Sequence, residues 1–313
     1  MPPSIEVQHL VKRYKKGDRN AVDDVSFTVE PGQLFALLGP NGAGKTTIVS
    51  ILTTTLTPTS GRASILGLDV ATQASQVRRK VGIIFQNPSL DLNLTAEENI
   101  RLHATLYGLY PFRPTYAAMP DTYRQEVKRL ADIIGLGSDV FKPMKQFSGG
   151  MKRKLEIIRS LIHSPKVLFL DEPTIGLDPA SRRNLWEYLT TVRNGNGMTI
   201  FLTTHYLEEA EQSDMICIIN QGKVAAYGTP EALKAQLVAQ SYLLVDSADR
   251  EGLRTELTRA ALPFEETPRF KISLASQSAQ QIIRRIETPL SLVKTHIPTL
   301  EDAYLSIVDN DND

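Results

Sequence analysis

Nine residues at positions 39–47 carry the clearest chemical pattern in the sequence. They read GPNGAGKTT and fit the pattern G-x-x-x-x-G-K-[ST] in full. In this pattern backbone N–H groups turn inward around an anion, the lysine reaches the β- and γ-phosphates, and the next hydroxyl ligates Mg²⁺. An ordinary glycine-rich turn is the alternative, but the complete motif predicts a nucleoside triphosphate site. The residues assigned to it are Gly39, Pro40, Asn41, Gly42, Ala43, Gly44, Lys45, Thr46 and Thr47.

The segments on either side of this loop are the ones that a phosphate loop requires. Residues 34–38 are all apolar and predict a buried strand, and residues 46–52 predict the start of a helix. The N-terminus of that helix would add its partial positive charge beside the bound phosphates.

Two adjacent carboxylates, Asp171 and Glu172, follow a second apolar run at residues 167–170. In a parallel sheet the carboxyl ends of the strands face the ligand, so these side chains should lie near the phosphate loop. We expect Asp171 to orient Mg²⁺, which prefers oxygen ligands. We expect Glu172 to act as the general base for the attacking water, an effect typically worth about 10²–10⁴ in rate. A solvated acidic pair at a strand end is the alternative.

Two further polar residues occupy element boundaries. His205 follows the predicted strand at residues 199–203 and is expected to donate to a γ-phosphate oxygen, although a lone histidine is more often structural. Asp178 precedes Pro179, a pair that predicts an N-cap and the first helical residue. Capping alone would account for both of these residues.

The segment 147–151, FSGGM, predicts a helix N-terminus with Ser148 as N-cap and unobstructed N–H groups at Gly149 and Gly150. Three cations follow at once, which opposes the helix dipole unless anions lie nearby. We expect either such anions, a nucleotide phosphate and acidic groups among them, or a solvated basic face. The three cations are Lys152, Arg153 and Lys154.

Bulk composition narrows the class of protein. The 313 residues suffice for about two domains, and 35 basic residues cancel 35 acidic ones, which argues against a general nucleic-acid binder. The single cysteine, Cys217, excludes a disulfide framework and lies in a predicted buried strand. No apolar run reaches the ~18–20 residues of a spanning helix, and the N-terminal residues do not predict a signal peptide. Any membrane role is therefore expected to come through a partner.

Strands alternate with helices through most of the chain, which predicts an α/β fold with a mainly parallel sheet. We expect a helical subdomain at about 95–165, interrupted by a loop at 107–120 that holds three prolines. Beyond about residue 239 short strand-like segments alternate with polar helical ones. We therefore predict domains at 1–239 and 240–313, the second a small α+β extension. Further predicted strands lie at 5–14, 21–29, 81–85, 241–245 and 270–274, and helices at 73–80, 179–192, 206–212, 250–261 and 278–286, with a long amphipathic helix after Ser148.

Taken in order, these motifs resemble the ATP-binding subunit of an ABC transporter, over roughly residues 5–239. The elements are Walker A (39–47), the Q-loop glutamine Gln86, the signature (147–151), Walker B (167–172), the D-loop (175–178) with Asp178, and the switch histidine His205. The resemblance implies a P-loop NTPase cassette with an antiparallel β subdomain and a helical signature subdomain. It also implies that Gln86 ligates Mg²⁺ and contributes to catalysis, and that Tyr14 stacks on adenine; cross-strand packing is the alternative for Tyr14.

The same resemblance implies partners. Two cassettes face each other head to tail, and Ser148, Gly149 and Gly150 of one close over the ATP, with its Mg²⁺, held by the other. The chain should then pair with a second copy or a close relative and with integral membrane permease subunits, on the cytoplasmic face of the membrane, without nucleic acid. A non-transport ABC ATPase acting on ribosomes or DNA is the alternative, although its usual paired cassettes, coiled-coil arms and zinc-type cysteines are absent from the sequence.

Finer features resemble the daunorubicin/doxorubicin-resistance branch, whose members energise ABC-2 type exporters of drugs; related cassettes serve lipids or polysaccharides. These features are residues 85–91, 202–210 and 298–304 and the signature ending in Met151. Met151 departs from the glutamine that is usual there and cannot reach back to the N-cap N–H. We expect hydrolysis to survive this change. The aromatic residues within 107–116 either dock a partner or pack within the subdomain.

Overall fold

The computed structural model describes residues 2–15, 18–85, 90–133, 135–175, 177–235, 241–266, 268–274, 277–296 and 299–309. The chain divides into two compact units, Met1–Ala225 and Ala226–Asp313, and each is described by itself. The domain boundary expected between residues 239 and 240 lies outside the described residues and stays a prediction.

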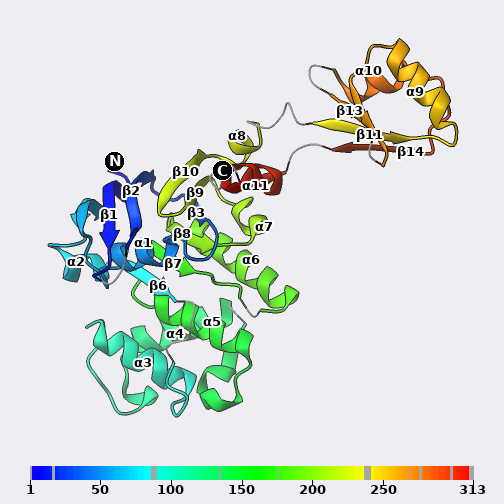
Figure 1. The fold of residues 1–313 in the computed structure, drawn as a ribbon. Coiled ribbons are helices and arrows are strands. Elements are labelled where there is room, and N and C mark those ends of the chain that lie inside the picture. Colours follow the sequence, from blue (N-terminus) through cyan, green and yellow to red (C-terminus); the bar gives the residue numbers. More distant parts are fainter. Residues whose placement is uncertain are drawn as a thin grey trace. The chain divides into compact units, whose positions relative to one another are not determined.

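A six-stranded sheet forms the centre of the first unit, in the order β10-β9-β3-β8-β7-β6 (Figure 1). The pairs that link β9, β3, β8, β7 and β6 are all parallel, which confirms the predicted sheet. Every residue of β3, β7 and β8 is buried, as expected for strands covered on both faces. The strands are β3 (Leu34–Leu38), β6 (Val81–Ile84), β7 (Val167–Asp171), β8 (Thr199–Thr204), β9 (Met215–Asn220) and β10 (Lys223–Gly228).

Four helices accompany this sheet. They are α1 (Lys45–Leu52), α2 (Ala74–Arg78), α6 (Pro179–Asn196) and α7 (Leu207–Ala210). Helix α1 follows β3 directly and α7 follows β8, so both begin at the carboxyl edge of the sheet. This edge therefore gathers the loops in which the sequence places its chemical motifs.

An antiparallel sheet, ordered β2-β1-β4-β5, forms a β subdomain. Its core face shares apolar contacts with the parallel sheet, where the ring of Phe35 lies 5.1 Å from those of Phe27 and Phe201. This aromatic stack fixes the β subdomain against β3 and β8. The strands are β1 (Ile5–Arg13), β2 (Asn20–Val29), β4 (Ser60–Ile65) and β5 (Leu68–Asp69).

A helical subdomain occupies the lower part of Figure 1. A capping box between Thr95 and Glu98 starts its first helix. The predicted interruption at 107–120 is confirmed, and there the rings of Tyr110 and Tyr116 pack edge-on against the buried Tyr123. The subdomain contains α3 (Ala96–Leu106), α4 (Asp121–Ile133) and α5 (Gly149–Leu161), with 3₁₀ turns at Tyr116–Ala118, Gly137–Phe141 and Met144–Gln146.

The second unit holds a four-stranded antiparallel sheet, ordered β12-β13-β11-β14. The strands of this sheet and the two helices between them follow the order β-α-β-β-α-β, which is that of ferredoxin-like domains. This confirms the predicted α+β extension and adds two strands, β12 and β14. None of the described helices of the chain is long and apolar enough to cross a membrane. The elements are α8 (Pro230–Ala235), β11 (Tyr242–Asp246), α9 (Arg250–Arg259), β12 (Phe264–Glu266), β13 (Phe270–Ser273), α10 (Ala279–Ile283), β14 (Leu292–His296) and α11 (Leu300–Asp309).

Candidate functional site

Residues 39–44 form the loop that joins β3 to α1, and residues 45–47 are the first turn of α1, so the motif lies between a strand and a helix as the sequence predicts. Two of its glycines are required by their surroundings. A Cβ at Gly39 would lie 2.3 Å from the carbonyl oxygen of Ile219, and one at Gly44, whose φ is +108°, would lie 2.4 Å from that of Ala21. No side chain caps α1, so the first amides of the helix have no acceptor within it. The loop and helix end thus offer N–H groups to an anion.

Lys45 is buried at the first position of α1. Its ammonium group donates to the carbonyl oxygens of Gly39 at 2.7 Å and Pro40 at 3.1 Å, so it lies across the loop. Burial lowers the pKa of Lys45, while the negative charges of Glu172 and Asp171 raise it. The carboxylates at the end of β7 therefore act electrostatically on the lysine of the loop.

Asp171 is the last residue of β7 and is 6% exposed. Burial raises the pKa of its carboxyl group, whereas a hydrogen bond from the Thr203 hydroxyl and the cations of Lys45 and Arg153 lower it. Glu172 follows with φ of 48°, an uncommon left-handed conformation, and its N–H donates to the carbonyl oxygen of Thr203 at 3.1 Å. The left-handed conformation of Glu172 ends the extended backbone of β7 directly after Asp171.

His205 lies just beyond β8, with its Nδ1 atom 3.4 Å from Oε1 of Glu172. The buried Glu209 of α7 stabilises this arrangement, a role that the sequence motifs do not indicate. It accepts hydrogen bonds from the hydroxyls of Thr204, at 2.7 Å, and of Thr174. A glutamate four residues beyond a histidine carries no distinctive sequence signal, and only the fold reveals that it ties two loops together.

At the signature segment Ser148 is the N-cap of α5, as predicted, and its hydroxyl accepts from the N–H of Met151 at 3.2 Å. Met151 packs against the apolar core of the helical subdomain. A Cβ at Gly149 would meet no atom within 4 Å. Among the described residues no hydrogen bond or ion pair joins this segment to the loop at 39–47. Within one chain, then, the structure does not bring these two motifs together.

Arg153 lies beside an acidic group, Glu156, as one of the two expectations for the basic run has it, and not on a solvated face. It is 7% exposed, so it belongs to no solvated basic face, and its partners lie within the chain. It donates to the carbonyl oxygens of Phe85 at 2.7 Å and Pro173 at 2.9 Å, and to Glu156 at 2.9 Å. Arg153 therefore links the signature helix to the start of the Q-loop and to the segment after Glu172.

The remaining candidate residues lie around this edge. Tyr14 is 46% exposed just after β1, and its hydroxyl is 3.2 Å from that of Thr47. Asp178 caps α6, as predicted, by accepting from two backbone N–H groups at 3.0 Å. Gln86 and Gly176 lie outside the described residues, so the roles expected of Gln86 stay predictions.

Comparison with known proteins agrees with this geometry. Residues 22–175 match a protein-family model described as ABC transporter. The chain is 35% identical to the daunorubicin resistance ATP-binding protein DrrA3 of Streptomyces coeruleorubidus, over 98% of this chain and 96% of that protein. It is 39% identical to the probable multidrug ABC transporter ATP-binding protein YbhF of Escherichia coli, over 74% of this chain but only 38% of YbhF. The chain thus spans about two fifths of the length of YbhF.

Solved structures give the same result. One described as the ATP-binding subunit of an ABC transporter superposes with a TM-score of 0.65 and 32% identity, over 74% of this chain and 92% of that one. A dimeric cassette in a post-hydrolysis state with ADP and Pi, MJ0796, has a TM-score of 0.64 at 24% identity, over 72% of this chain and 98% of that one, and supports the fold alone. The chain therefore belongs to the family of ABC transporter ATP-binding proteins, which are ATPases built on this cassette.

Proposed function

We propose that this chain is the ATP-hydrolysing subunit of a membrane exporter. The observation that carries the proposal is the convergence of Lys45, Asp171 and Glu172 at one edge of the parallel sheet, where both carboxylates act on the lysine. Relatives named for multidrug transport, daunorubicin resistance and Nod factor export support the exporter class. The non-transport alternative, on ribosomes or DNA, has no observation in its favour.

The phosphates of ATP bind at the N–H groups of residues 39–47, and Lys45 exchanges its two carbonyl acceptors for β- and γ-phosphate oxygens. The hydroxyl of Thr46 and the carboxylate of Asp171 are oxygen donors suited to Mg²⁺. Mg²⁺ takes few protein ligands and completes its shell with phosphate and water. When bound, Mg²⁺ neutralises charge on the phosphates.

Glu172 takes the proton of the attacking water as general base. Its carboxylate is 3.4 Å from the ring of His205, so the histidine both orients the base and faces the position of the γ-phosphate. The Thr203 hydroxyl accepts a hydrogen bond from the N–H of Glu172 and donates one to Asp171, and together these bonds hold the two residues in fixed relative positions. Tyr14, exposed next to Thr47, supplies a stacking surface for adenine.

The second half of the site comes from another subunit. Ser148, Gly149 and Gly150 form a helix N-terminus that binds no group of its own chain's phosphate loop, and an incoming γ-phosphate would use its N–H groups and the Ser148 hydroxyl. A second copy of this chain, or a close relative, supplies this cap in trans. Asp178, at the start of α6, lies in the D-loop of the same interface.

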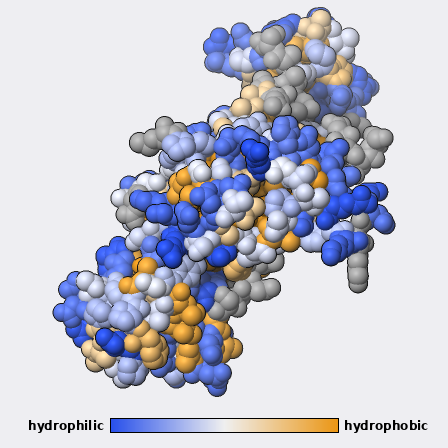
Figure 2. Space-filling view, turned by 90° about the vertical axis from the view of Figure 1, so that its left-hand side faces the viewer, coloured by the Kyte–Doolittle hydropathy of each residue, from blue (hydrophilic) through white to orange (hydrophobic). Residues whose placement is uncertain are grey.

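A membrane permease subunit would dock on the helical subdomain. Figure 2 shows apolar side chains gathered on the lower lobe, which this subdomain forms. Leu102, Leu106 and Phe112 are 43%, 76% and 62% exposed there, and apolar side chains exposed together mark interaction surfaces. The protein then works on the cytoplasmic face of the membrane, held by its partner, and Gln86, next to Phe85, relays the contact to the ATP site.

The decisive experiment measures phosphate release from ATP and Mg²⁺ by the purified protein. Wild type should hydrolyse ATP, Lys45→Ala should lose nucleotide binding, and Glu172→Gln should keep binding but hydrolyse at least about a hundredfold more slowly. Hydrolysis by Glu172→Gln at the wild-type rate would remove this residue from the base role. Unchanged ATP affinity in Lys45→Ala would contradict the phosphate-cradle assignment.

A further inference from the structure

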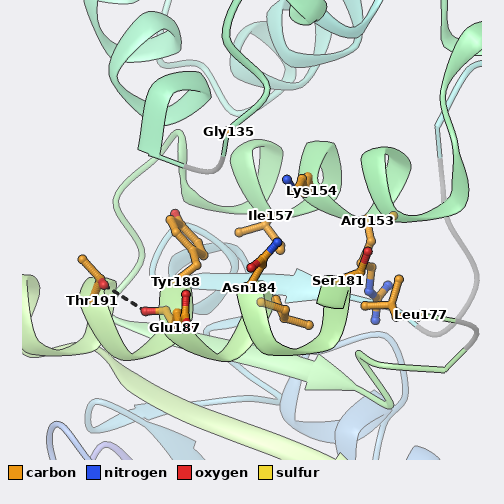
Figure 3. Close-up of a pocket in the computed structure, with 12 residues that line it drawn as sticks. Gly135, Arg153, Lys154, Ile157, Leu177, Ser181, Asn184, Glu187, Tyr188 and Thr191 are labelled. Carbon is orange, nitrogen blue, oxygen red and sulfur yellow. Dashed lines mark hydrogen bonds between the residues drawn. The ribbon is translucent and has the colours of Figure 1, made fainter. Parts of the chain in front are cut away.

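A cavity of about 370 Å³ lies between α5 and α6 (Figure 3), and no residue of the segment 39–47 lines it. Its floor is α6 and its roof is α5, with Ile157 and Asn184 facing each other across the middle. The volume falls in the range of small-molecule sites. Gly150, which the proposed function assigns to the partner's ATP, lines one end of it, whereas none of the residues proposed to bind ATP in the same chain does.

The lining combines an apolar centre with unpaired cationic and polar groups. Ile157 and Leu185 are 2% and 5% exposed and supply the apolar surface. Lys154 forms no ion pair with any described residue, and in Figure 3 its ammonium group points toward the Gly135 end of the cavity. The Nη2 atom of Arg153, at the opposite end, is buried without a hydrogen-bond partner among the described residues.

Tyr188 is the second buried group without a partner. The residue is 6% exposed, its hydroxyl is inaccessible to water, and it makes no hydrogen bond to any described residue. In Figure 3 the hydroxyl rises from α6 toward Gly135, on the side of Lys154. Buried hydroxyls are normally paired, so this donor lacks the acceptor that it would ordinarily have.

We infer that this cavity is a regulatory site for a small amphipathic anion, with an apolar body between Ile157 and Leu185 and its anionic group at Lys154 and Tyr188. The inferred regulation rests on the proposed ATPase function, whereas the binding does not. Helix α5 begins at the signature and α6 begins at Asp178. Near those ends the helices almost touch, since a Cβ at Gly150 would lie 3.0 Å from the Ser181 hydroxyl.

A ligand between these helices therefore fixes the spacing of two segments of the proposed dimer interface, of which the signature contacts the partner's nucleotide. It changes the rate of hydrolysis without competing with ATP. Exposed Glu187, at the α6 rim of the cavity, disfavours ligands with a second anionic group on that side.

The test uses anilinonaphthalene sulfonate, an aromatic sulfonate, with N-phenylnaphthylamine as its neutral counterpart. The only tryptophan of the chain, Trp186, is on α6 beside Leu185 and reports binding by quenching of its emission. Wild type should bind the sulfonate saturably, and more tightly than the neutral probe. Lys154→Gln should weaken sulfonate binding about tenfold and Tyr188→Phe about threefold, as expected for a charged and a neutral hydrogen bond.

Steric filling provides a matched pair of variants. Asn184→Phe inserts a ring into the cavity from an exposed position and should abolish saturable binding, whereas Thr190→Phe, exposed on the same helix but outside the cavity lining, should not.

Equal sulfonate affinity in all variants would overturn the site, and equal affinity for both probes would overturn its preference for an anion. Saturating sulfonate should change the maximal ATPase rate with the KM for ATP unchanged. Binding without this change would refute the regulatory role alone, and a wild type without ATPase activity would refute the proposed function instead.

Discussion

Replacement of Arg153 by methionine should strongly destabilise the first unit of the chain. The substitution keeps the length of the side chain but removes hydrogen bonds of 2.7–2.9 Å to Phe85, Pro173 and Glu156. Glu156, 2% exposed, then stays buried without this cation. Breaking a buried ion pair from one side costs about 3–5 kcal/mol. Because Glu156 has a further interaction, we expect about 3 kcal/mol.

Urea unfolding monitored by Trp186 fluorescence measures this cost, since the single tryptophan lies in the first unit. With a slope of about 3 kcal/mol/M, the midpoint should fall by about 1 M. The double variant Arg153→Met/Glu156→Met should lie closer to wild type than the single one, because it removes the unpaired buried charge. Arg183→Met, at an exposed position of α6, is the control and should change stability by less than about 0.5 kcal/mol. A single variant as stable as wild type, or additive losses in the double variant, would refute the reasoning.

Three further predictions concern burial and the signature. Burial lowers the pKa of His103 to about 3. Between pH 6.5 and 3 the unfolded chain therefore binds a proton at this histidine that the folded chain does not bind. The free energy of unfolding should fall as the pH drops through this range, by up to about 1.4 kcal/mol per pH unit. His103→Gln should flatten the dependence of the free energy of unfolding on pH, measured by urea titration. An unchanged dependence would contradict the role of His103. Burial also raises the pKa of the Cys217 thiol to about 12, so a thiol reagent at pH 8 should label the protein only after denaturation; rapid native labelling would contradict this. Met151→Gln should keep ATPase activity within a few-fold, because the Ser148 cap and the glycine N–H groups are unaffected; complete loss would show that the apolar packing of Met151 is required.

The sequence predicts the elements with strong local signals. The apolar run of β3 followed by a glycine loop, the Asp178–Pro179 helix start and the Ser148 cap are each decided by neighbouring residues. The short strands β12 and β14 were missed, because three to five half-exposed residues carry no clear period. Pairing with β13 and β11 is what makes them strands.

The residues of the candidate site likewise divide into those that the sequence predicts and those that it does not. Lys45, Asp171 and Glu172 were predicted because their motifs are contiguous in sequence. The roles of Arg153 and Glu209 depend on segments up to 68 residues away in sequence, and no local pattern indicates such partners. Arg153 was expected to face either anions or solvent, since a cation near the start of a helix opposes the helix dipole; its pairing with Glu156 agrees with the first expectation, whereas its carbonyl partners were not expected. Burial with carbonyl oxygens and Glu156 is the physical reason why it is tolerated there.

The central claim is that two protomers clamp ATP between the phosphate loop of one and the Ser148 helix end of the other. Light scattering of Glu172→Gln with ATP and Mg²⁺ tests it most directly, because slow hydrolysis should trap the complex. We expect the mass to rise from 34.7 kDa toward twice that value. Adding Ser148→Arg to the same chain should prevent the rise in mass while ATP binding persists. A monomer that stays a monomer with ATP bound at saturation would contradict the claim.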